Sequence, residues 1–166
     1  MQARVAVVIA AGFLLGAANP RPSATAPAAS ADVLESHRGV LQACKARRAD
    51  WLWPLFTDHF RRGFESMAER FRTAMDAKDL KEGFGYVGDP AGFDGKAYLA
   101  GALKAQRQAE DPCEGVEGWT GLSHGPSGQH HVFAVRRADG LLFGLKFKKV
   151  DERWYLDDIT QPVKAK

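Results

Sequence analysis

Apolar and polar positions alternate most regularly near the end of the chain. The apolar residues Leu141, Phe143, Leu145 and Phe147 are separated by Leu142, Gly144, Lys146 and Lys148. Strict alternation is typical of a strand with one buried and one wetter face. Similar runs at 129–137 and 153–159 flank this one, with only residues 138–140 and 151–152 between them. The three runs predict an antiparallel meander, preceded by a strand at 116–124 that turns through 125–128.

Upstream, apolar residues recur every three or four positions, which is the period of a helix. They predict helices over 33–48, 60–75 and 95–110, and a short helix that begins near Asp50. Between Lys81 and Phe93, four glycines and Pro90 predict a long loop. Its Gly83-Phe84-Gly85-Tyr86-Val87-Gly88 matches the dinucleotide fingerprint in letters only, because a helix rather than a strand precedes it. This order of elements predicts an α+β fold, with N-terminal helices packed on an antiparallel sheet.

The first 31 residues have a different composition from the rest. Arg4 precedes an apolar run at 5–15, which is typical of a secretory signal peptide and has roughly half of the ~20 residues that a spanning helix needs. We therefore expect a signal peptide at 1–18, a linker rich in Pro, Ala and Ser at 19–31, and one α+β domain at 32–162. Cleavage after Ala18 is preferred to cleavage after Ala31. The expected product is periplasmic or secreted, and has no integral membrane span. It is not a lipoprotein, because the segment has no cysteine.

Charge argues against a nucleic-acid partner. The whole chain has a net charge of +3, and Arg4 and Arg21 both precede Asp32, so the chain from Asp32 onward has a net charge of only +1. Basic pairs such as Arg47-Arg48 and Arg61-Arg62 have acidic neighbours, as solvated faces commonly do. Proteins that bind nucleic acids usually carry a concentrated basic surface instead.

Cys44 and Cys113 are the only cysteines in the sequence. In an oxidising compartment they are expected either to pair or, alternatively, to be small core residues. A disulfide between them would close a loop of about 70 residues and stabilise the fold by roughly 4 kcal/mol in the chain-entropy account. A catalytic thiol is the third alternative, but no electropositive, exposed niche is evident around either cysteine.

The hydrophobic pattern also predicts the register of the meander. A three-residue loop with Gly140 in the left-handed conformation pairs Val135 with Phe143 and Phe133 with Leu145, and places His131 opposite Phe147. A two-residue turn at 151–152 then pairs Phe147 with Leu156, Leu145 with Asp158, and Lys146 with Asp157. This register places Asp158 on the apolar face.

Asp158 and His131 are the candidate catalytic residues that follow from this register. Desolvation would raise the pKa of a carboxyl group among Phe143, Leu145 and Leu156, and enzymes tune general acids and bases in this way. His131 is its natural companion, because a histidine beside a carboxylate can shuttle protons near neutral pH. The alternative is that Asp158 lies at the sheet rim and that His131 has no catalytic role.

Three histidines near the second predicted strand invite a metal interpretation. His130 and His131 project to opposite faces of a strand, so they cannot ligate one ion together without a bulge. His124 and His131 are diagonal neighbours on one face, but two ligands fall short of the usual three or four. We therefore expect neither a metal nor a cofactor.

The order of elements and two short phrases resemble the nuclear transport factor 2-like superfamily. The phrases are the charged turn followed by Trp154-Tyr155-Leu156-Asp157, and Asp50-Trp51 with Leu55-Phe56 after the first helix. This family, which includes ketosteroid isomerase and SnoaL-type cyclases, has a cone-shaped, cystatin-like α+β fold. The resemblance implies a curved sheet, a cavity between sheet and helices, and often a homodimer through the outer sheet face. Isomerase members place a catalytic tyrosine on the first helix, and residues 33–48 contain none, so no catalytic residue is carried over.

The sequence is compatible with three functions. The leading hypothesis is an exported, non-enzymatic domain that binds a small apolar ligand or a protein partner through the sheet cavity and the 81–93 loop. The second is a small hydrolase, isomerase or cyclase that uses Asp158 and His131, and the third is a structural envelope interaction module with a filled core. The ligand-binding candidates share the apolar face of the sheet: Phe133, Val135, Phe143, Leu145, Phe147 and Leu156.

Overall fold

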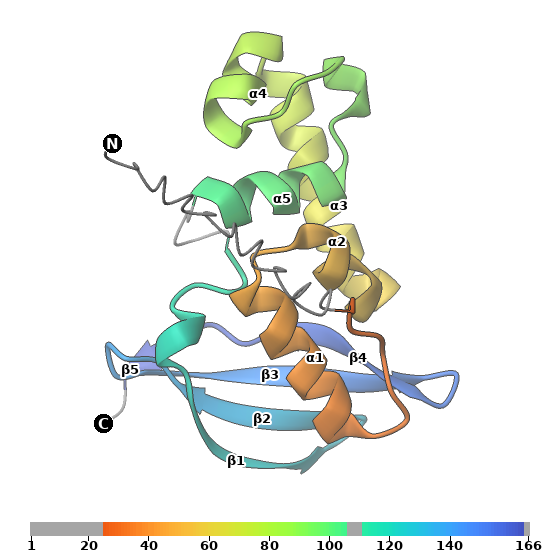
Figure 1. The fold of residues 1–166 in the computed structure, drawn as a ribbon, viewed down its shortest axis with the longest axis vertical. Coiled ribbons are helices and arrows are strands. Elements are labelled where there is room, and N and C mark those ends of the chain that lie inside the picture. Colours follow the sequence, from red (N-terminus) through yellow and green to blue (C-terminus); the bar gives the residue numbers. More distant parts are fainter. Residues whose placement is uncertain (1–24, 106–110, 165–166) are drawn as a thin grey trace, which may run out of the picture.

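The chain folds into helices packed against an antiparallel sheet, as a computed structural model of residues 25–105 and 111–164 shows (Figure 1). Within these residues the α-helices are α1 (Val33–Lys45), α2 (Ala49–Leu52), α3 (Asp58–Ala74), α4 (Ala77–Phe84) and α5 (Gly95–Ala105). The strands are β1 (Thr120–Ser127), β2 (His130–Arg136), β3 (Leu141–Val150), β4 (Arg153–Ile159) and β5 (Val163–Lys164). Three short 3₁₀ helices lie at Trp53–Leu55, Pro90–Gly92 and Val116–Gly118. The predicted α+β class is confirmed.

Side-chain caps explain where most of the helices begin. Asp32 accepts a hydrogen bond from the Leu34 amide at 2.7 Å at the start of α1, and Thr57 accepts one from the Phe60 amide at 3.2 Å at the start of α3. Asp76 caps α4, a helix that the sequence analysis missed, and α4 ends at Gly85, whose φ is +66°. The long loop predicted for 81–93 is therefore shorter, because its first third belongs to α4.

The sheet has the strand order β1-β2-β3-β4, with β5 paired to β3. The predicted register between β2 and β3 is confirmed: Val135 pairs with Phe143, Phe133 with Leu145, and His131 with Phe147. Gly140 has φ +84°, as the bulged loop requires. The strand predicted at 116–124 begins later and ends later than expected. Val116–Gly118 form a 3₁₀ turn, and the strand itself is β1, which runs from Thr120 to Ser127.

The predicted register between β3 and β4 is wrong beyond Phe147. Phe147 does pair with Leu156, but a bulge follows, so Lys146 pairs with Asp158 and Leu145 with Ile159. Asp157 is the extra residue of the bulge. The shift places the apolar Ile159, rather than a carboxylate, opposite Leu145.

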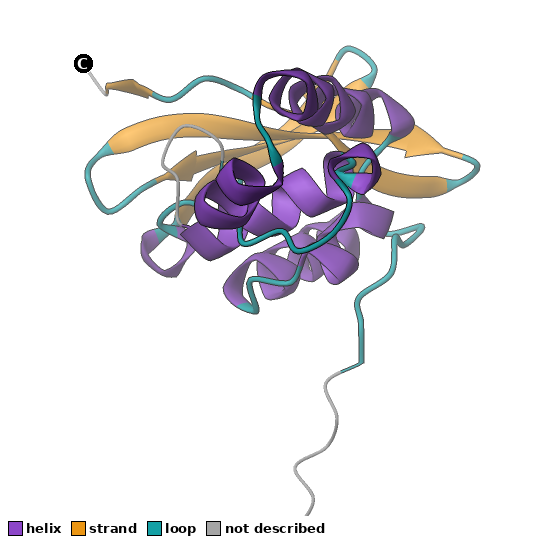
Figure 2. Cartoon of the chain, turned by 90° about the horizontal axis from the view of Figure 1, so that it is seen from above, coloured by secondary structure: helices purple, strands orange, loops and turns teal. Residues whose placement is uncertain are grey.

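The core lies between α1 and one face of the sheet, and continues among α3, α4 and α5. Figure 2 shows the helices and the sheet from above. We call the face against α1 the inner face and the opposite one the outer face. The six residues predicted to bind a ligand are only 0–7% exposed. A second aromatic cluster joins α3, α4 and α5, and contains Phe64, Phe71, Phe84, Phe93 and Tyr98.

A disulfide joins α1 to the segment that precedes the sheet. Cys44 and Cys113 are bonded, their Cα atoms lie 5.1 Å apart, and both residues are almost completely buried. Beside the disulfide, Arg47 forms an ion pair with the side chain of Asp111, which is fully buried. The sequence left open whether the two cysteines are paired or are separate core residues, and in the structure they are paired.

The predicted signal peptide at 1–18 lies outside the described residues, as do residues 19–24 of the predicted linker. The end of that linker packs on the domain: Ser30 forms an antiparallel bridge with Trp154, and Pro27 lies close to Gly39 on α1. No helix within residues 25–105 and 111–164 is both long and apolar enough to cross a bilayer.

Candidate functional site

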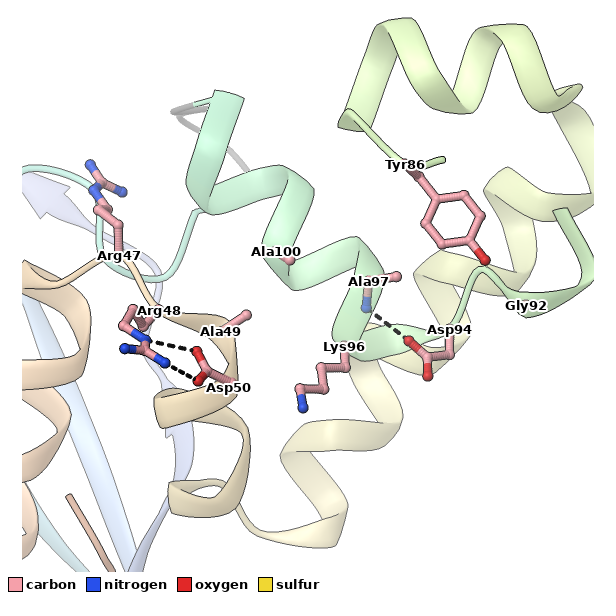
Figure 3. A pocket seen from close by; sticks show the side chains of 10 residues that line it. All are labelled: Arg47, Arg48, Ala49, Asp50, Tyr86, Gly92, Asp94, Lys96, Ala97 and Ala100. Atoms are coloured by element: carbon pink, nitrogen blue, oxygen red, sulfur yellow. Dashed lines mark hydrogen bonds and ion pairs between the residues drawn. The ribbon is translucent and has the colours of Figure 1, made fainter. Parts of the chain in front are cut away.

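A groove of about 530 Å³ lies between α2, α5 and the loop that follows α4 (Figure 3). This volume is within the range of small-molecule sites. Ten residues line the groove: Arg47, Arg48, Ala49, Asp50, Tyr86, Gly92, Asp94, Lys96, Ala97 and Ala100.

Close packing of α5 positions one wall of the groove. Gly95 is the first residue of α5, and it lies so close to α3 that a Cβ atom added to it would be 2.7 Å from the Glu65 backbone nitrogen. The Gly95 amide also donates a hydrogen bond to the Glu65 carboxylate at 2.8 Å. This approach directs Ala97 and Ala100 toward the groove, while Ala49 contributes from α2. Small side chains on both walls leave the space open, and they give it an apolar surface.

Tyr86 closes the end of the groove beyond Ala97 (Figure 3). Its ring packs edge-on against Phe93, with centroids 5.2 Å apart, and its hydroxyl donates to the Asp89 carbonyl at 3.2 Å. These contacts hold the loop after α4, so the groove has a defined aromatic wall.

Most charges at the groove are already paired. Arg48 donates to both oxygens of Asp50 and lies over Trp51, 4.5 Å from the ring centroid. The hydrogen bond from Arg48, together with the smaller effect of the Lys96 charge, holds the pKa of the Asp50 carboxyl below its ordinary value. Arg47 is paired with Asp111, as described above.

Lys96 is the exception among these charges. Asp94, its neighbour, accepts a hydrogen bond from the Ala97 amide at 2.8 Å, where the positive end of α5 also favours a carboxylate. In the part of the chain that the structure describes, the Lys96 ammonium makes no ion pair or hydrogen bond. The groove therefore combines an apolar surface with one uncommitted cation.

The structure separates the two predicted catalytic residues. Asp158 lies on the outer face, where its carboxylate accepts a hydrogen bond from Lys146 at 2.8 Å and its side chain is 45% exposed. His131 lies on the inner face, with its Nε2 2.9 Å from the Nδ1 of His124. Burial, and secondarily the charge of His124, lower the pKa of His131. The expectation that Asp158 is desolvated beside His131 is wrong, because the bulge turns Asp158 to the other face.

The six apolar ligand-binding candidates belong to the core rather than to the groove. Phe133 packs between His37 and Phe147, with centroids 4.0 and 5.5 Å away, and the others are similarly enclosed. Ligand binding by these residues stays a prediction, and it would require the core to open.

A histidine–carboxylate pair that the sequence analysis missed lies on the outer face. His130 Nε2 is 2.8 Å from Asp157 Oδ2, and Thr57 donates to the other oxygen of Asp157 at 2.6 Å. The projection of His130 away from His131 was predictable from strand geometry, but its partner depends on the bulge.

Neither a metal site nor a similarity to known proteins identifies a function for this chain. Among the described residues, no group of three or more His, Cys, Asp or Glu side chains is placed to hold a metal ion. No protein-family model, curated protein or solved structure matches the chain. Membership of the nuclear transport factor 2-like superfamily therefore stays a prediction.

Proposed function

We propose that this protein is a binding domain that holds a small amphipathic carboxylate in the groove between α2 and α5. The single observation that supports this most directly is Lys96, an unpaired cation at the edge of a surface made by three alanines and a tyrosine. An apolar body would lie on Ala49, Ala97 and Ala100, with an aromatic or branched end against Tyr86. The carboxylate would pair with Lys96.

A monocarboxylate suits the charge of the groove better than a polyanion does. Arg47 and Arg48 already have carboxylate partners, and breaking either pair would leave a negative group without its cation. One new negative charge would pair with Lys96. The Asp94 carboxylate also lines the groove and has only the Ala97 amide as a partner among the described residues, so it disfavours any further negative charge. A phosphate or a dicarboxylate would bring more charge than the groove has cations to meet.

The expected affinity is modest because the groove is open. A ligand of about 11 non-hydrogen atoms, contributing about 0.4 kcal/mol each, binds with a Kd of roughly 1 mM. Removing the lysine from an exposed ion pair costs about 1 kcal/mol, which corresponds to roughly fivefold in Kd. Titration followed by protein NMR measures affinities in this range.

The test uses 3-phenylpropionate and its uncharged analogue, 3-phenylpropanol. We expect Lys96→Met to weaken binding of the acid about fivefold and to leave binding of the alcohol unchanged. Lys104→Met is the matched control, because Lys104 lies on the same helix outside the groove. Ala100→Trp should block both probes, since residue 100 is exposed and the indole would fill the groove.

Two results would contradict the proposal. The first is equal loss of acid binding in the two lysine variants, and the second is acid binding that survives Ala100→Trp. If neither probe binds the wild-type chain, the interaction-module hypothesis gains weight. Mass spectrometry of the intact protein under native conditions would then show whether it carries a different ligand or a second copy of itself.

A further inference from the structure

One row of side chains crosses the outer face at the end near the β1–β2 turn. The register pairs Ser127 with His130, His130 with Lys148, and Lys148 with Tyr155. Directly opposed residues on neighbouring strands have their Cβ atoms about 4.5–5.5 Å apart. A base, a cation and a phenol therefore lie side by side on three adjacent strands.

Asp157 orients the histidine of this row. The Asp157 side chain is 8% exposed, and the His130 side chain is 20% exposed. Burial opposes ionisation of Asp157, but hydrogen bonds from Thr57 and His130 outweigh it and lower the pKa of the carboxyl. With the Nε2 hydrogen donated to Asp157, Nδ1 of His130 is the nitrogen that can accept a proton from a substrate.

The β4 bulge makes this pairing available. Asp157 and Asp158 both lie opposite Lys146, and Lys146 bonds to Asp158. Asp157 is thereby left to His130 and to Thr57, the residue that also caps α3. Bulges are frequent beside active sites because they redirect side chains in this way.

Lys148 and Tyr155 supply the complement to the base. Lys148 is half-buried, and its ammonium has no hydrogen bond or ion pair among residues 25–105 and 111–164. Tyr155 and Thr57, the hydroxyl partner of Asp157, also line a small cavity of about 220 Å³. Phe56 and Val150 give this cavity apolar walls, and Asp58, Arg61 and Asp151 complete its lining. A short alkyl or acyl group fits a space of that size.

We propose that the outer face is a hydrolytic site for small carboxylic esters, with His130 as the general base. His130 Nδ1 removes a proton from water while the water oxygen forms a bond to the carbonyl carbon. The carbonyl oxygen becomes an oxyanion, which Lys148 and Tyr155 stabilise. The ester C–O bond then breaks, the proton passes from the imidazolium to the departing alkoxide, and a carboxylic acid and an alcohol are released.

An ester fits the row better than a phosphate does. Attack on a carbonyl carbon creates one oxyanion, which one ammonium and one phenol can bind. Phosphoryl transfer spreads charge over three equatorial oxygens and needs more cations than this row contains. Asp157 acts through His130, so it is a positioning residue rather than a catalytic one.

The test is hydrolysis of p-nitrophenyl acetate by the full chain. General base catalysis contributes about 100-fold or more, so His130→Gln should lower kcat/KM by at least that factor. Exposed imidazoles also cleave activated esters, so His124→Gln on the inner face is the matched control and should change the rate less than twofold. Lys148→Met should lower kcat because it removes the cation that binds the oxyanion. Asp157→Asn should lower kcat and shift the pH profile.

Thermal unfolding of each variant separates loss of the site from loss of the fold. His130→Gln keeps a hydrogen-bond donor near Asp157, so its Tm should stay within a few degrees of the wild-type value. The proposal is overturned if wild-type and folded His130→Gln proteins hydrolyse the ester equally. It is also overturned if His124→Gln loses as much rate as His130→Gln.

Discussion

Acid should destabilise this protein through His37, a half-buried histidine on α1. Its ring stacks on Phe133, with centroids 4.0 Å apart and planes 3° apart, and meets the edge of Phe147. Among the described residues, its Nε2 is a buried polar atom with no hydrogen-bond partner. Burial, and then the charges of His124 and Arg38, lower the pKa of His37 from 6.5 to about 4. The groups that face it are therefore apolar or cationic.

The sign of the effect follows from proton binding. Between pH 6.5 and 4 the unfolded chain protonates at this position while the folded chain does not, so the free energy of unfolding falls as the pH falls. Above pH 6.5 the histidine has no effect, and below about pH 4 the loss is complete. One pKa unit corresponds to about 1.36 kcal/mol, which gives an upper limit of about 3 kcal/mol. Partial access of solvent to the ring reduces this to about 2 kcal/mol.

The assay is urea unfolding at pH 7.5, 5.5 and 4, followed by circular dichroism. His37→Phe keeps a flat ring over Phe133 but cannot titrate, so it should lose about 2 kcal/mol less than wild type between pH 7.5 and 4. His59→Gln, which replaces an exposed histidine, is the control and should follow the wild-type pH dependence. Identical pH dependence in wild type and His37→Phe would refute the reasoning.

Two further predictions concern packing and the disulfide. Replacing Cys44 and Cys113 together by Ala should lower the free energy of unfolding by about 4 kcal/mol, because the disulfide closes a loop of 69 residues. Equal urea midpoints for the wild type and the double variant would contradict this. Gly101→Ala should destabilise the fold by about 1–3 kcal/mol, because the new Cβ atom would lie 2.6 Å from the Phe84 Cβ atom. Gly63→Ala is the matched helical control, since no atom lies within 4 Å of its added Cβ, and it should stabilise the fold by about 0.5–1 kcal/mol in the same urea titration.

Strand register was predictable where apolar residues oppose one another on both strands. The pairing of Phe133 with Leu145 and of Val135 with Phe143 buries four apolar side chains, and a one-residue slip would expose them. The β4 bulge was not predictable in this way, because β4 also bonds to the segment before α3, which lies about 100 residues earlier in the chain. Phe56 pairs with Leu156, and the Thr57 amide donates to the Leu156 carbonyl at 2.9 Å.

The candidate sites were less predictable than the sheet. The groove depends on how α5 packs against α3 and α2, and hydrophobic periodicity gives no angle or separation between helices. The glycine-rich loop was predicted to take part in binding, and Tyr86 and Gly92 from that loop do line the groove. The apolar sheet face was predicted to line a cavity. Hydrophobic periodicity does not show that side chains from α1 cover this face, which they do.

The disulfide makes the chain from Cys44 to Cys113 a covalently closed ring. The groove walls come from both arms of that ring, with Arg47 and Ala49 just after one cysteine and Ala97 and Ala100 about 15 residues before the other. One peptide bond cut anywhere within the ring leaves a single covalent molecule with both walls still attached. A protease that nicks this part of the protein would therefore not separate the two halves of the groove until a reductant opened the ring.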